Sequence, residues 1–270
     1  ADIFTDLDQI KDAFRKYVGL IRPEGVILVK HADANIQDVL GEAVCQVETY
    51  GYLDGADWQI GDYRFEGGLG CFSLSHLGKK QGDFQLAMIG RHNVENAAAV
   101  AALCLGLGLT ADEINSAFKS FQGIKRRQEV VGVKKGVTVL DDFAHHPTAI
   151  RLTLEAVKEA YPGQRVWAVF EPRSATSRRK VFEQDFPDSF LVADKVVIAG
   201  LFAPDKISQE DRLDPEQVVA RLIEKGTDAC YIQEVDDIVS FMAENLKSGD
   251  VVLVMSSGGF GGIHQKILDQ

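Results

Sequence analysis

Two carboxylates and two imidazoles are concentrated in one short stretch, residues 141–148, which reads DDFAHHPT. The apolar run 137–140 before it predicts a buried strand, and Pro147 suits the first turn of a helix, where a backbone N–H is not needed. The acids and histidines are therefore expected at a strand end and a helix start, where free N–H groups and the helix dipole favour an anionic ligand such as a nucleotide or a carboxylate. The apolar residues that predict the helix are Ile150, Leu154 and Val157.

Other interpretations of this stretch remain open. An aspartate at a strand end and a histidine at a helix start can act as caps without any chemistry. Asp142, His145 and His146 can also be considered as metal ligands, but adjacent histidines at a helix start do not easily reach one ion, and no further Cys or His is near in sequence. A nucleophilic triad is poorly supported, because no Gly-x-Ser-x-Gly elbow is present.

Two further polar loops follow predicted strands. Residues 171–179 (EPRSATSRR) place arginine near hydroxyl groups, a combination that binds carboxylates or phosphates. Residues 256–262 (SSGGFGG) join a strand to a helix through glycines and can expose N–H groups to an anion, although tight packing alone would also explain the glycines. The side chains considered for substrate binding are Arg173, Ser174, Thr176, Ser256 and Ser257.

The second half of the chain alternates regularly between apolar runs and amphipathic segments. This alternation predicts an α/β fold with a mostly parallel sheet covered by helices, and with ligands at the carboxyl ends of the strands. A domain boundary is predicted near Gly123, which gives domains 1–123 and 124–270. Strands are predicted at 137–140, 166–170, 195–198, 229–232 and 251–255, and helices after Arg178, Asp214, Val235 and Gly262.

The first half of the chain mixes helical and strand patterns. A helix is predicted over 10–18 and a buried strand within 25–30, and Asn35 is predicted to cap a short helix. Residues 44–90 are predicted as strands, with a hairpin turn at 79–82. The pattern is helical again from Asn93, and the sequence 110–113 (TADE) is a capping box that begins another helix.

Composition excludes several classes of protein. A formal net charge of -11 over 270 residues argues against non-specific nucleic-acid binding. No apolar run approaches membrane-spanning length, and no signal peptide is apparent. The four scattered cysteines lack metal-type pairing, are expected as buried thiols and suit a reduced, cytoplasmic protein. Because the chain begins at Ala1 without an initiator Met, it is expected to be a fragment.

Three motifs together resemble the Mur ligases of bacterial cell-wall synthesis: residues 90–99 (GRHNVENAAA), the pair Arg126–Arg127 and residues 141–148. Their order and spacing both match that family. The loops 171–176 (EPRSAT) and 255–264 (MSSGGFGGIH) are similar to the murein peptide ligase branch. The L-alanine-adding branch shares the motif of two aspartates, an aromatic residue and HHPT, but differs at these two loops.

The resemblance covers essentially the whole chain and implies its architecture. Residues 1–123 are similar to the later part of the family's central ATP-binding domain, and 124–270 to its Rossmann-like C-terminal domain. The N-terminal domain, the phosphate loop and the Glu and His that hold magnesium are expected upstream of Ala1. The resemblance thus implies an amide-forming ligase of which this chain is an inactive fragment.

The family's reaction supplies the implied substrates and cofactors. ATP phosphorylates the lactyl carboxylate of UDP-N-acetylmuramate, and an amine then attacks the acyl phosphate. For this branch the resemblance implies ATP and Mg²⁺ as cofactors and the recycled murein tripeptide L-alanyl-γ-D-glutamyl-meso-diaminopimelate as the nucleophile, in the cytoplasm. The alternatives are free L-alanine as the nucleophile, or a non-catalytic module that binds nucleotide or peptide.

By matching position, the resemblance also implies roles for individual residues. His92, Asn93 and Asn96 would line the adenine end, and asparagine amides can pair with a purine edge. Arg127 would face phosphate oxygens, and Asp142 would contact the nucleotide. The histidines that would position the acyl phosphate or the attacking amine are His145 and His146.

Overall fold

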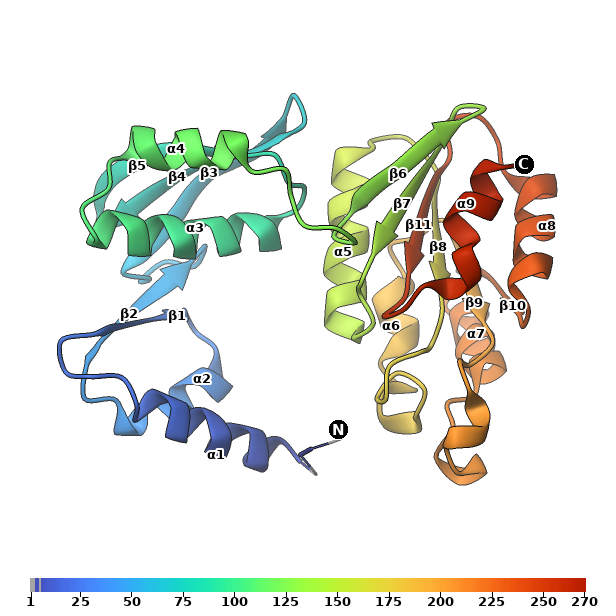
Figure 1. Cartoon of the computed structure of the whole chain (residues 1–270), viewed down its shortest axis with the longest axis horizontal. Helices are drawn as coiled ribbons and strands as arrows, with labels where there is room; N and C mark the ends of the chain where they lie inside the picture. Colours follow the sequence, from blue (N-terminus) through green and yellow to red (C-terminus); the bar gives the residue numbers. More distant parts are fainter. Residues whose placement is uncertain (1–2, 5) are drawn as a thin grey trace. The chain divides into compact units, whose positions relative to one another are not determined.

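The computed structural model describes residues 3–4 and 6–270 and divides the chain into two compact units, Ala1–Gln122 and Gly123–Gln270 (Figure 1). The division lies next to Gly123, the residue that ends the first domain predicted from the sequence. No helix in the described ranges is both long enough and apolar enough to cross a membrane.

Unit 1 is built on a five-stranded sheet with the strand order β1-β2-β3-β4-β5. The first three strands run parallel, and β3, β4 and β5 pair antiparallel. Small residues on one face of α3, among them Ala98 and Ala101, pack against the sheet in an apolar core around Phe72 and Phe84. The strands are Val26–Lys30, Gln46–Gly51, Trp58–Glu66, Leu69–His76 and Lys79–Leu86; the helices α1 to α4 are Leu7–Val18, Ala34–Val39, Arg91–Gly106 and Ala111–Ser120, and a 3-10 turn covers Leu40–Glu42.

Two local predictions in unit 1 were wrong. The hairpin turn lies at Leu77 and Gly78, not at 79–82, because both residues adopt the positive φ that a two-residue hairpin turn needs. The cap of α2 is Asp33 and not Asn35, since the Asp33 carboxylate accepts hydrogen bonds from the first backbone N–H groups of the helix. The predicted capping box before α4 is confirmed.

Unit 2 is a six-stranded sheet with the order β10-β9-β8-β11-β7-β6. All neighbouring strands are parallel except β6, which pairs antiparallel with β7 through a tight turn at 135–136. The mostly parallel α/β fold is therefore confirmed. The strands β6 to β11 are Glu129–Lys134, Val137–Asp142, Val166–Phe170, Lys195–Ala199, Asp228–Ile232 and Val251–Met255; the helices α5 to α9 are Pro147–Ala160, Phe186–Phe190, Pro215–Glu224, Val235–Asn245 and Ile263–Leu268.

Helices cover both faces of this sheet. Figure 1 shows α8 and α9 on one face and α5 on the other. Successive side chains of a strand point to opposite faces of the sheet. Val137 and Val139 of β7 lie in the core under α8 and α9. Asp141 continues that series, whereas Asp142 continues the series of Leu140 on the α5 side. The two acids at the end of β7 therefore leave the strand in opposite directions.

The prediction of a helix directly after Arg178 was wrong. The segment makes a single 3-10 turn, Lys180–Phe182, before the short helix α6 begins at Phe186. Pro187 lies in the first turn of α6, where its missing N–H is tolerated. Further 3-10 turns cover Pro204–Lys206, Gln209–Asp211 and Phe260–Gly262.

Candidate functional site

The three polar loops of unit 2 meet at one edge of its sheet. β11 lies between β7 and β8, and Met255 is in register with both Asp142 and Phe170, the last residues of those strands. The loops after these strands therefore begin side by side, as parallel strands dictate. This edge holds all predicted site residues of unit 2, and His92, Asn93 and Asn96 belong to unit 1.

Asp142 is a buried anchor for backbone N–H groups. Its side chain is buried, with 2% of the residue exposed; Oδ1 accepts a hydrogen bond from Ala144 N at 2.7 Å and Oδ2 accepts one from Gln128 N at 2.9 Å. Burial raises the pKa of Asp142, and these two hydrogen bonds only partly oppose it. Both oxygens are thus already engaged, and a direct contact with nucleotide stays a prediction.

Residues 126–128 form a tightly held turn, here called the arginine turn. Arg126 and Gln128 both have left-handed backbone, with φ of 60° and 52°. The Arg126 N–H donates to the Glu129 carboxylate at 2.8 Å, and the Arg126 carbonyl accepts from Phe143 N at 2.8 Å. Arg127 at the tip is exposed; its guanidinium lies 5.6 Å from the centre of the Phe143 ring and makes no hydrogen bond or ion pair in the described part of the chain. The turn therefore presents one free cation on a fixed backbone.

His145 and His146 use their ring nitrogens differently. His145 Nδ1 lies 2.9 Å from the Phe143 carbonyl, which can only accept, so Nδ1 carries a proton and Nε2 keeps a lone pair in the neutral ring. His146 caps α5, because its Nδ1 accepts from Thr148 N at 3.3 Å. Burial, followed by the charge of His145, lowers the pKa of His146. The capping interpretation thus holds for His146, and His145 retains a basic nitrogen.

In the loop after β8, Arg173 is held by stacking. Its guanidinium lies 3.5 Å from the centre of the Phe202 ring and 3.6 Å from the Glu171 carboxylate. A Cβ on Gly258 would fall 1.9 Å from Arg173 Nε, so a larger residue at this position would force the Arg173 side chain to move. Ser174 uses its hydroxyl within the loop, donating to Ser177 Oγ at 2.8 Å. Glu171 begins the predicted polar loop 171–179 but was not predicted as a site residue, and no sequence motif marks Phe202.

The glycine-rich turn, residues 256–262, is organised by Ser256. Its hydroxyl donates to Glu171 Oε2 at 2.5 Å and accepts from Gly258 N at 3.0 Å, and the residue is 1% exposed. These contacts orient the turn, and peptide binding by Ser256 stays a prediction. Ser257 and Thr176 are half-buried on the same two loops.

The predicted adenine-binding residues begin α3 of unit 1. Gly90, with φ of 92°, precedes the helix. Asn93 is buried and its amide donates to Ile89 O at 2.8 Å, whereas Asn96 is exposed and His92 half-buried. The Arg91 guanidinium stacks on the rings of two tyrosines that the sequence did not indicate, Tyr52 at 4.1 Å and Tyr63 at 5.0 Å.

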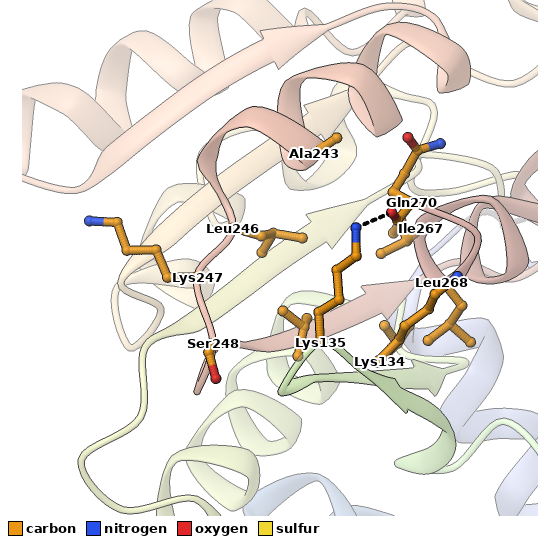
Figure 2. A pocket seen from close by; sticks show the side chains of 11 residues that line it. Lys134, Lys135, Ala243, Leu246, Lys247, Ser248, Ile267, Leu268 and Gln270 are labelled. Atoms are coloured by element: carbon orange, nitrogen blue, oxygen red, sulfur yellow. Dashed lines mark hydrogen bonds between the residues drawn. The ribbon is translucent and has the colours of Figure 1, made fainter.

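Two cavities lie at different edges of the unit 2 sheet. One of 490 Å³ opens at the carboxyl ends of β8, β9 and β10, with Phe202, Val235 and Phe260 among its apolar walls and Glu171 and Arg212 among its charged groups. The other, of 290 Å³, lies near the amino end of β7 and is drawn in Figure 2. Its lining includes Lys134, Lys135 and Lys247 and none of the predicted site residues.

The two α/β units, the second with three polar loops gathered at the carboxyl edge of its sheet, are the architecture against which known families were compared. The sequence profile of the Mur ligase middle domain matches residues 1–104, and that of the Mur ligase glutamate ligase domain matches residues 126–258. The chain belongs to the Mur ligase family and carries its middle and C-terminal domains.

Individual relatives agree with this assignment. A UDP-N-acetylmuramate–L-alanine ligase from Caldanaerobacter subterraneus subsp. tengcongensis is 36% identical over 270 residues, which is 100% of this chain and 58% of the relative. The crystal structure of a murein peptide ligase from Psychrobacter arcticus has a TM-score of 0.68 and 30% identity, covering 98% of this chain and 55% of that one. A MurF ligase from Thermotoga maritima in complex with ADP, 18% identical, shares the fold with a TM-score of 0.71 over 97% of this chain and 56% of its own. The chain thus spans little more than half the length of these relatives.

Proposed function

We propose that this chain is part of an ATP-dependent ligase that forms an amide between the lactyl carboxylate of UDP-N-acetylmuramate and an amine, in the cytoplasm. The family match supports the reaction class, and the ADP complex of the related MurF ligase supports ATP as the phosphoryl donor. The observation that carries the proposal is that the exposed guanidinium of Arg127, on the anchored arginine turn, and the ring of His145 both contact the Phe143 ring, at 5.6 Å and 5.2 Å.

The residues divide the chemistry between phosphate and amine. Arg127 offsets the charge of the phosphate oxygens as the acyl phosphate forms and breaks. The amine nitrogen bonds to the acyl carbon, the carbon–oxygen bond to phosphate breaks, and phosphate leaves with the electron pair. Nε2 of His145 takes the proton that the amine loses. His146, the next residue, caps α5. His92, Asn93 and Asn96, at the start of α3 in unit 1, are the residues proposed to hold the adenine.

Magnesium would screen the phosphate charges in such a reaction. Within residues 3–4 and 6–270 no group of three His, Cys, Asp or Glu side chains is placed to hold a metal ion. That magnesium ligands lie upstream of Ala1 stays a proposal from the family resemblance, and no step is derived through the metal.

The comparisons favour L-alanine as the amine. The curated relatives with 32–36% identity are UDP-N-acetylmuramate–L-alanine ligases, which supports this substrate better than the tripeptide expected from the two loops. The murein tripeptide remains a second candidate, because a murein peptide ligase is 30% identical over 98% of the chain. Competition between L-alanine and tripeptide in an active protein that contains this chain decides between them. Preferential consumption of the tripeptide would contradict the L-alanine assignment.

Arg127 provides the test of the reaction itself. Because its exposed guanidinium makes no hydrogen bond or ion pair in the described part of the chain and only a 5.6 Å contact with the Phe143 ring, Arg127→Ala should change the melting temperature by no more than about 2 °C and lower ATP-dependent ligation by about a hundredfold or more. Arg151→Ala is the matched control, since Arg151 pairs with Glu155 on the exposed side of α5. Equal activity of the two variants would refute the role of Arg127.

A further inference from the structure

A second anchor lies behind the arginine turn, on the opposite face of β7 from Asp142. Asp141 is buried, with 9% of the residue exposed, and Oδ2 accepts from Arg126 Nε at 3.2 Å. Its Oδ1 lies 3.2 Å from Nε2 of His264 in α9. Both of these atoms are buried, and the close contact between them falls short of hydrogen-bond geometry. His264 thus meets the second oxygen of a carboxylate whose first oxygen holds Arg126.

The guanidinium of Arg126 extends this contact to the glycine-rich turn. Its Nη2 donates to the Ser256 carbonyl at 2.6 Å and to the Gly258 carbonyl at 2.7 Å. Ser256 N in turn donates to the carbonyl of Asp142 at 3.2 Å. One arginine side chain therefore links the arginine turn, the end of β7 and the glycine-rich turn, through segments far apart in the sequence.

We propose that Asp141 and His264 are positioning residues that fix Arg126 and thereby hold the arginine turn and the glycine-rich turn as one unit. This inference rests on the proposed function. If it is correct, Arg127 and the N–H groups of the glycine-rich turn stay at a constant distance from each other, and both can contact the reacting phosphate. Neither Asp141 nor His264 needs to touch a substrate for this role.

The electrostatics of Asp141 agree with that arrangement. Burial opposes ionisation of the carboxyl group, but the close contact with His264, and then the ion pair with Arg126, outweigh it and hold the pKa of Asp141 below its usual range. A carboxylate that stays ionised keeps its charge-assisted bond to Arg126, which is stronger than a neutral one. Without His264, Oδ1 would be buried with no polar group beside it. The ionised form of Asp141 would be destabilised, and its bond to Arg126 would weaken.

Amide hydrogen exchange in this chain tests the coupling. In His264→Ala we expect the amides of Gln128 and Gly258 to exchange about tenfold faster, since both depend on segments held by Arg126. His264→Gln, whose side-chain amide can replace the donor at Nε2, should restore the slow exchange. Gln265→Ala, on the exposed side of the same helix, is the control. Faster exchange confined to α9 would show that His264 only packs that helix and would overturn the proposal.

Arg126→Lys keeps the inference testable if His264→Ala fails to fold. Lysine retains the charge but cannot bridge two carbonyls and a carboxylate, so the same two amides should exchange faster, and unchanged exchange would overturn the coupling. In an active protein containing the chain, His264→Ala should lower kcat about tenfold and change the KM for the amine less than twofold. Faster exchange with unchanged kcat would refute the positioning role. A wild-type protein without ligation would contradict the proposed function instead, and the exchange data would then decide the coupling alone.

Discussion

Replacing Asp142 with asparagine is the sharpest perturbation of the site. The two side chains have the same shape, but the amide offers one acceptor where the carboxylate offers two. Asp142 now accepts from Ala144 N and Gln128 N. In Asp142→Asn, the amide NH₂ would face one of these backbone donors, and that N–H would be left buried without a partner.

The expected cost follows from these two bonds. Hydrogen bonds to a charged acceptor contribute roughly 1.5–3 kcal/mol each, but the raised pKa of Asp142 shows that burial of the charge offsets part of this. We therefore expect Asp142→Asn to lower the free energy of unfolding by about 2–4 kcal/mol. For a unit of this size the melting temperature should fall by roughly 5–15 °C.

Urea and thermal unfolding followed by tryptophan fluorescence measures this effect. The chain has two tryptophans, and in a Trp58→Phe background the buried Trp167 reports on unit 2 alone. Asp205→Asn is the matched control, because Asp205 is exposed. If Asp142→Asn melted within about 1 °C of that control, the carboxylate would not be anchoring the arginine turn, and the reasoning would be refuted.

Three further changes test other parts of the structure. Gly258→Ala should displace Arg173 from its ring partner and cost about 1–3 kcal/mol, measured by urea unfolding. Burial opposes ionisation of Asp250, but hydrogen bonding to Arg165 outweighs it and lowers the pKa of Asp250 in the folded state. The ionised carboxylate therefore stabilises the fold above the pKa of the unfolded state, and this stabilisation is lost as the pH falls through the pKa of the folded state. Asp250→Asn should therefore be less stable than wild type at neutral pH and converge with it in acid unfolding. Thr110→Ala removes the capping box of α4 and should destabilise unit 1 by about 1 kcal/mol, seen by circular dichroism during urea unfolding.

The sheet of unit 2 was predictable because its strands are apolar on both faces. Runs such as 166–170 and 251–255 are fully buried, and they alternate with helices, so strand bounds and parallel direction followed from the sequence. Turns were less predictable, because 79–82 has turn-like composition while the positive φ lies at Leu77 and Gly78. Burial of the cysteines was also overestimated, since only Cys71 is buried.

The position of the three polar loops was predictable, but the partners of their residues were not. Strand ends and polar loops indicated the carboxyl edge of the sheet. The engagement of Asp142 depends on the left-handed conformations of Arg126 and Gln128, which are non-glycine residues and give no sequence signal. His264 meets Asp141 only because α9 returns to the face of β7 on which Asp141 projects.

The two adjacent aspartates at the end of β7 are therefore not redundant. Strand alternation sends their side chains to opposite faces, so Asp142 binds the backbone of the arginine turn and Asp141 binds its side chain at Arg126. A single carboxylate on either face would hold one of these contacts and leave the other without an acceptor. The doublet thus fixes the turn from both sides of the sheet, and Arg127 between the two held residues is left free for a ligand.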